Sequence, residues 1–249
     1  MTAEEMETLK DYHGATPKPP DFEEFWAKRM AEADLVPMEY SLSQAREAPS
    51  FGLCLAQDLW FTGMGGAKVY AKYLRPALDG PVPLVLQFHG YPGASRSFAE
   101  QASFVGMGMA ILAMDCPGQG GLGFDYGGFL GTTASGHLVA GLDGPPENMY
   151  YVRLHQNIRI LTRLVRVLPG IDLNRVFVNG ASQGGALGLA CTALNPELVN
   201  RAAILYPFLS DFKLVWDLGA DAIAYEGLRY YARWFDPDER QEDRWFRQL

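Results

Sequence analysis

The fold of this chain is decided by the stretch Val176-Phe177-Val178-Asn179-Gly180-Ala181-Ser182-Gln183-Gly184-Gly185. It contains the pattern Gly-x-Ser-x-Gly directly after a β-forming run and before an apolar, helix-like segment at residues 186–194. In that context the serine lies on a tight turn from strand to helix, where side chains two positions away would collide with the turn. Gly180 and Gly184 remove those side chains. The pattern therefore predicts an exposed Ser182 hydroxyl; the alternative is an ordinary turn serine.

Strand-like and helical segments alternate on both sides of this turn. Residues 55–62 and 68–74 alternate in polarity, and Gly63-Met64-Gly65-Gly66 between them suits a hairpin, so we expect antiparallel edge strands there. After Pro83 the runs become continuously apolar, which is typical of parallel strands buried on both faces. These runs are Leu84–Phe88, Ala110–Met114, Val176–Val178 and Ala202–Leu205. Their order predicts an α/β fold with a mostly parallel, doubly wound sheet and antiparallel N-terminal strands.

Helical periodicity appears in several segments. Residues 1–40 are predicted to form an N-terminal arm with one short helix near residues 21–30, and the longest helix is expected at about 147–168. The sequence Asp236-Pro237-Asp238-Glu239 resembles a helix start, with Asp236 as the N-cap. No interdomain linker interrupts the pattern, so residues 1–249 are predicted to be a single domain.

Composition excludes several classes of protein. The formal net charge of −8 and the pI near 5.0 disfavour nucleic acid as a partner. No basic, apolar leader is present, and no apolar run approaches the ~20 residues of a membrane span, so no membrane partner is expected. Cys54, Cys116 and Cys191 are too few and scattered for a disulfide framework or a zinc site, and we expect them to be buried. We therefore predict a cytoplasmic protein that holds no metal.

A second motif, Gln87-Phe88-His89-Gly90-Tyr91-Pro92-Gly93, follows the first buried strand. In folds with a serine on such a turn, the loop after this strand supplies one backbone N–H to an oxyanion, and the residue after the serine supplies another. We therefore expect an oxyanion hole formed by the N–H groups of Tyr91 and Gln183. His89 precedes Ser182 and belongs to this loop, so a structural role is expected for it. The glycine-rich segment 118–144 lacks the spacing of a dinucleotide or phosphate loop and is predicted to be irregular.

The chain as a whole resembles the acetyl xylan esterases and cephalosporin C deacetylases, which form carbohydrate esterase family seven of the α/β-hydrolases. The resemblance rests on segments spread over nearly the whole chain: Asp21-Phe22-Glu23-Glu24-Phe25-Trp26, Val69-Tyr70-Ala71-Lys72, His89-Gly90-Tyr91, Gly118-Gln119-Gly120, Gly180-Ala181-Ser182-Gln183-Gly184-Gly185 and Pro207-Phe208-Leu209-Ser210-Asp211-Phe212. It implies that Ser182 removes O-acetyl groups from small xylo-oligosaccharides and cephalosporins without a cofactor. It also implies an intracellular, ring-shaped homohexamer. One departure is Pro117, because the family usually has arginine there, and loop geometry or substrate range is expected to differ.

No histidine follows Ser182. Hydrolases of this fold place an Asp or Glu and then a His after the serine, whereas His13, His89, His137 and His155 all precede it. We therefore expect a chain that is incomplete at its C-terminus, lacks the strands that carry the Asp and the His, and is inactive alone. The alternatives are a peptidase or thioesterase on the same fold, and a non-catalytic, hydrolase-like binding protein.

Overall fold

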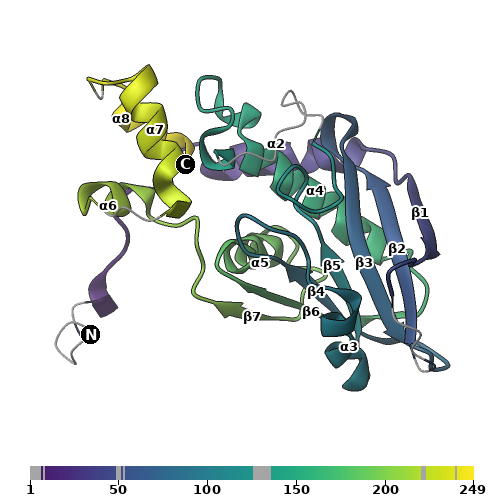
Figure 1. Cartoon of the computed structure of the whole chain (residues 1–249). Coiled ribbons are helices and arrows are strands. Elements are labelled where there is room, and N and C mark those ends of the chain that lie inside the picture. The colour runs from purple at the N-terminus through teal and green to yellow at the C-terminus, as the bar shows by residue number, and fades with distance from the viewer. Residues whose placement is uncertain are drawn as a thin grey trace.

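A single mixed sheet organises the chain in the computed structural model, which describes residues 7, 9–48, 52, 54–125, 136–219, 223–238 and 240–249 (Figure 1). Its strand order is β1-β2-β3-β5-β4-β6-β7. The strands are β1 (Tyr40–Gln44), β2 (Cys54–Thr62), β3 (Lys68–Pro76), β4 (Val82–Phe88), β5 (Ala110–Met114), β6 (Ile171–Ala181) and β7 (Arg201–Leu205). Antiparallel pairing joins β1, β2, β3 and β5, and parallel pairing joins β5, β4, β6 and β7. The predicted α/β fold with antiparallel N-terminal strands is confirmed.

Two predictions about the sheet were wrong. Strand β7 was expected to be buried on both faces, but four of its five residues are exposed because it lies at the edge of the sheet. Strands β2 and β3 were expected at the edge, but β1 pairs with β2 and covers it. The sequence of β1, Tyr-Ser-Leu-Ser-Gln, is short and polar, and four of its five residues are exposed. Such a strand buries too little apolar surface to produce a clear periodic signal.

Helices cover both faces of the sheet, as in a doubly wound fold. The α-helices are α2 (Phe22–Leu35), α3 (Phe98–Gly106), α4 (Tyr150–Val165), α5 (Gln183–Leu194), α6 (Phe212–Asp217), α7 (Glu226–Phe235) and α8 (Glu242–Gln248). Short 3₁₀ turns are η1 (Leu9–Asp11), η2 (Met64–Gly66), η3 (His137–Val139), η4 (Pro146–Asn148) and η5 (Ile223–Tyr225). Helices α6, α7 and α8 gather beyond the β7 side of the sheet, away from β1 (Figure 1). None of the described helices has the length and apolar composition needed to cross a bilayer.

Alternate residues of the central strands serve two separate cores. Leu84 and Leu86 of β4 belong to a cluster shared with α2, α4 and α5, whereas Val85 faces a smaller cluster that includes Phe98 of α3. A third cluster joins α6, α7 and α8, with Trp245 fully buried in it. Because β4 and β6 are enclosed on both faces, the turn that follows β6 is held in a rigid frame.

The helix boundaries differ from the predicted ones in ways that hydrogen bonds explain. Helix α4 begins at Tyr150 because residues 146–148 form the separate turn η4. Helix α8 begins at Glu242 rather than directly after Asp236, so the predicted N-cap was misplaced. The Asp236 carboxylate instead accepts the N–H groups of Arg240 and Gln241, at 3.1 and 2.8 Å, in the preceding turn. Glu239 lies outside the described residues.

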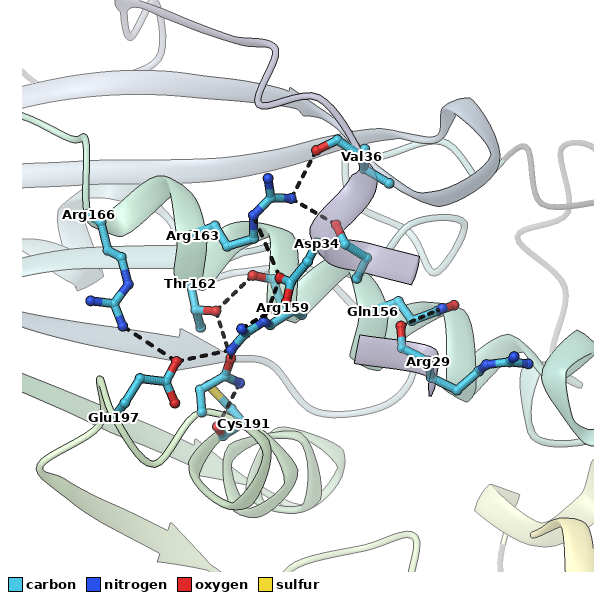
Figure 2. Close-up of polar contacts among 12 residues, drawn as sticks. Arg29, Asp34, Val36, Gln156, Arg159, Thr162, Arg163, Arg166, Cys191 and Glu197 are labelled. Carbon is cyan, nitrogen blue, oxygen red and sulfur yellow. Dashed lines mark hydrogen bonds and ion pairs between the residues drawn. The ribbon is translucent and has the colours of Figure 1, made fainter. Parts of the chain in front are cut away.

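An ion-pair network fastens α2 to the helices beneath it (Figure 2). The Arg159 guanidinium on α4 binds both carboxylate oxygens of Asp34 on α2, at 2.8 and 3.0 Å. It also donates to the Asn195 side chain, at the end of α5, at 2.8 Å, and to Glu197 at 3.0 Å. Because Arg159 is largely buried and forked, it links three segments at once.

A buried histidine on α4 predicts a pH dependence of stability. The His155 ring packs edge-on against Trp26 of α2, with centroids 5.4 Å apart, and its buried Nδ1 has no hydrogen-bond partner among the described residues. Burial lowers its pKa from 6.5 to about 4. The folded state therefore holds the neutral ring while the unfolded chain takes up a proton below pH 6.5, so the free energy of unfolding falls as pH drops from 6.5 to about 4.

We expect this histidine to lower the free energy of unfolding by about 1 to 3 kcal/mol over that pH range. The variant His155→Phe keeps the ring contact and removes the titration. Urea unfolding of both proteins at a series of pH values should show that the free energy of unfolding falls less steeply with decreasing pH in the variant. Identical slopes would rule out this role for His155.

Candidate active site

Ser182 lies at the junction of β6 and α5, where the backbone is strained. Its φ of 56° and ψ of −124° place it in a region that non-glycine residues rarely occupy. Three backbone hydrogen bonds hold it there: its N–H donates to Leu205 O at 3.1 Å, and its carbonyl accepts from Ala186 at 3.1 Å and Phe208 at 2.9 Å. The residue is half-buried, and its hydroxyl makes no hydrogen bond to any described residue. The fold therefore imposes the strain and presents a free hydroxyl.

The two glycines around Ser182 are required by close backbone approach. A Cβ atom at Gly180 would lie far inside van der Waals contact with the carbonyl of Gly184. A Cβ atom at Gly184 would collide in the same way with the carbonyl of Phe88, the last residue of β4. The turn thus presses directly against the neighbouring strand, which is the steric reason for the Gly-x-Ser-x-Gly spacing.

The loop after β4 lies beside the serine, as the sequence predicts. A Cβ atom built on Gly90 would be 4.0 Å from the Ser182 Cβ. Within the described part of the chain, neither the Tyr91 N–H nor the Gln183 N–H has a hydrogen-bond acceptor. Gln183 is the first residue of α5, so its N–H also lies at the positive end of the helix dipole. Two unpaired donors near a free hydroxyl can stabilise a negatively charged oxygen.

The Tyr91 side chain is fixed by aromatic and polar contacts. Its ring stacks near Phe208, with centroids 6.4 Å apart, and its hydroxyl accepts the Gly136 N–H at 3.1 Å. The hydroxyl also lies 3.3 Å from His137 Nδ1, while His137 Nε2 lies 3.0 Å from Gly118 O. A carbonyl only accepts, so Nε2 carries the proton and Nδ1 accepts from Tyr91. Burial lowers the pKa of His137, which favours this neutral form.

Gln183 also has a fully buried side chain that joins several loops. Its amide and that of Gln119 exchange two hydrogen bonds, at 2.8 and 2.9 Å. Tyr151 on α4 donates to Gln183 Oε1 at 2.7 Å, and Gln183 Nε2 donates to His89 O at 3.3 Å. Neither Gln119 nor Tyr151 was predicted from the sequence as a site residue. The Gly118-Gln119-Gly120 motif was the available signal for Gln119, and no local pattern pointed to Tyr151.

None of the four histidines forms a hydrogen bond with Ser182. His89 uses both ring nitrogens locally: Nδ1 donates to Gly90 O at 2.8 Å and Nε2 accepts from the Cys116 N–H at 2.9 Å. Burial lowers the pKa of His89 and keeps it neutral. His137 is held between Tyr91 and Gly118, His155 packs on Trp26, and His13 lines a cavity of about 840 Å³ between the N-terminal arm and α8.

The three cysteines differ in burial. Cys116 and Cys191 are buried, as expected, whereas Cys54 is only partly buried. Burial raises the pKa of the Cys116 thiol well above its usual value, which disfavours the reactive thiolate. Among the described residues, no group of three or more His, Cys, Asp and Glu side chains could hold a metal ion.

Pro117 stands where the family usually has arginine, and its carbonyl accepts a hydrogen bond from the Tyr150 hydroxyl at 2.8 Å.

A doubly wound sheet with a strained serine between a parallel strand and a helix is the arrangement of the α/β-hydrolases. The sequence model of one family within this class, described as Acetyl xylan esterase (AXE1), matches residues 1–249, and the chain belongs to that family.

Individual relatives agree with this placement. The chain is 30% identical over 227 residues to the acetyl esterase Axe7A of Xylanibacter ruminicola, covering 82% of this chain and 46% of that protein. Among solved structures it is similar to acetyl xylan esterase 1 from Thermoanaerobacterium sp., at 37% identity and a TM-score of 0.92, covering 98% of this chain and 76% of that one. It is also similar to an acetyl xylan esterase from Paenibacillus sp. R4, at 26% identity and a TM-score of 0.89, covering 98% and 77%. The chain thus spans about half the length of the curated relative.

Proposed function

We propose that this protein is a serine carboxylesterase that removes O-acetyl groups from small acetylated sugars such as xylo-oligosaccharides, and from cephalosporins. The observation that carries the proposal is the strained Ser182, whose hydroxyl is free and whose neighbours, Gln183 and the loop after β4, each carry an unpaired backbone donor. Family membership supports an ester substrate, and the activities for which the relatives are named support the acetyl group and xylan.

The reaction follows from this geometry. Ser182 Oγ attacks the acetyl carbonyl carbon, and the carbonyl electron pair moves onto oxygen, where the N–H groups of Tyr91 and Gln183 stabilise it. A base takes the hydroxyl proton and passes it to the sugar oxygen as the ester bond breaks, leaving an acetyl group on Ser182. Water then attacks the acetyl-enzyme with the help of the same base, and acetate leaves as the proton returns to Ser182.

The base in this scheme is not one of the four histidines of these 249 residues. His89 and His137 are occupied by local hydrogen bonds, and His155 and His13 lie against other elements. We propose that an imidazole from outside residues 1–249, oriented by a carboxylate, completes the site, and that these residues alone turn over slowly. We also propose a single hydrolase domain, a cytoplasmic location and, from the family resemblance, a homohexameric ring.

A substrate panel tests the proposed reaction. With the full-length protein, we expect acetate release from acetylated xylo-oligosaccharides and from p-nitrophenyl acetate to exceed hydrolysis of long-chain acyl esters, thioesters and peptides. A preference for thioesters or peptides would support the other enzyme readings on this fold. No turnover of any ester, together with no labelling of Ser182 by a fluorophosphonate, would support a non-catalytic binding protein.

A further inference from the structure

The side chain of Gln183 connects the two halves of the candidate oxyanion hole. Its backbone N–H is one donor of that hole, and its Nε2 donates to the carbonyl of His89, two residues before the other donor, Tyr91. The spacing between the two N–H groups therefore depends on where this side chain holds the loop after β4. Gln183 is fully buried, so a lost hydrogen bond there would not be replaced by water.

The orientation of the Gln183 amide is fixed by its partners. An amide can lie either way round, but the His89 carbonyl only accepts, so the NH₂ end of Gln183 must face it. Gln119 matches this orientation: its Oε1 accepts from Gln183 Nε2 at 2.8 Å while its Nε2 donates to Gln183 Oε1 at 2.9 Å. Tyr151 donates to that same Oε1 at 2.7 Å.

We propose that Gln119 is a positioning residue for the oxyanion hole: its reciprocal amide pair with Gln183 locks the bond to His89 and so sets the distance between the Tyr91 and Gln183 donors. This inference rests on the proposed esterase function. In this role Gln119 affects kcat although it needs no contact with the substrate. Loss of the lock should move one donor relative to the other, and displacements of about 1 Å in such sites cost on the order of 10²-fold in rate.

The substitution Gln119→Glu tests the lock by changing one atom. An ionised carboxylate at this position presents only acceptors, so one of its oxygens repels Gln183 Oε1. This repulsion is expected to displace the Gln183 side chain and weaken its bond to His89. A protonated carboxyl offers one O–H and one carbonyl oxygen, which reproduces the donor and acceptor of the original amide. The variant is therefore expected to be impaired when ionised and restored when protonated.

The surroundings favour such a titration. The titratable side chains packed around the pair are Tyr150, Tyr151, Cys116 and His89, with Asp115 next to Cys116. Burial raises the pKa values of the two tyrosines and the thiol well above their usual values and lowers that of His89, so these groups stay neutral. The nearby charged groups are Lys72, which acts on His89, and Asp125, which acts on Tyr150 and is paired with Arg153. Because the amide pair is buried, a carboxyl there is expected to ionise only well above the pH at which an exposed glutamate does.

For Gln119→Glu in the full-length protein, we expect kcat for p-nitrophenyl acetate to fall about 10- to 100-fold at alkaline pH, with KM changed less than about 3-fold. The ratio of variant to wild-type kcat should rise as the pH is lowered. Gln119→Met removes both hydrogen bonds without adding a charge, so it should lower kcat with a ratio that does not depend on pH. If Gln119→Glu does not fold, Gln119→Met still tests the proposal.

Gln101→Glu is the matched control. Gln101 on α3 is equally buried and donates to another glutamine, Gln87, at 2.5 Å, so the same carboxyl is buried in a second amide pair. Its kcat ratio should stay near 1 at every pH. An unchanged kcat in both Gln119 variants, or an equal loss in Gln101→Glu, would overturn the inference. An inactive wild type, or an active Ser182→Ala variant, would instead overturn the proposed function.

Discussion

Replacing Ser182 with alanine is expected to lower esterase kcat in the full-length protein by about 10⁶-fold, the loss measured when the serine of another hydrolase triad is removed. The reason is that the acetyl group then has no nucleophile to which it can be transferred. The loss should appear in kcat rather than in KM, measured with p-nitrophenyl acetate. Substantial residual turnover would show that another residue is the nucleophile.

The variant Ser182→Gly separates catalysis from folding. Glycine accepts the φ of 56° that strains serine, and strain of this kind costs on the order of 1 to 3 kcal/mol. We therefore expect Ser182→Gly to be as inactive as Ser182→Ala but to unfold at a higher urea concentration than the wild type. A less stable Ser182→Gly protein would argue against strain at this turn.

Gly184→Ala is expected to destabilise the protein strongly. The added Cβ would collide with the Phe88 carbonyl, and backbone atoms of a central strand cannot move aside as a flexible side chain could. A loss of about 3 kcal/mol or more is expected, because overpacking a rigid site usually costs 1 to 3 kcal/mol. The midpoint of urea unfolding measures it.

Gly106→Ala provides the comparison for that measurement. Gly106 ends α3, and a Cβ atom there would meet nothing within 4 Å. The substitution should leave stability unchanged or raise it slightly, because alanine has the higher helix propensity. Equal losses in Gly184→Ala and Gly106→Ala would contradict the steric account of the turn.

The parts of the fold that the sequence predicted are those with strong local signals. The strands β4 and β5 are continuous apolar runs, and the turn at Ser182 is marked by Gly180 and Gly184, which leave few alternatives. Helix α3 was not predicted, although Ser97 and Glu100 form a capping box at its start, because nine residues with few buried positions give a weak periodic signal. The strand β1 was missed for the same reason.

The parts of the site that the sequence did not predict depend on contacts distant in the chain. The amide pair of Gln119 and Gln183 joins residues 64 positions apart, and Tyr151 reaches it from a third element. No local sequence pattern indicates such a pairing, because a buried glutamine cannot be distinguished from an exposed one by its sequence context. The same holds for His89 and His137, whose tautomers depend on the carbonyls that happen to face them.

Covalent labelling shows whether Ser182 carries the acyl group during turnover. The full-length protein would be treated with a fluorophosphonate until esterase activity is lost, and the modified peptide identified by mass spectrometry. We expect a single adduct on Ser182, formed in step with the loss of activity. Loss of activity with the adduct on another residue would contradict it.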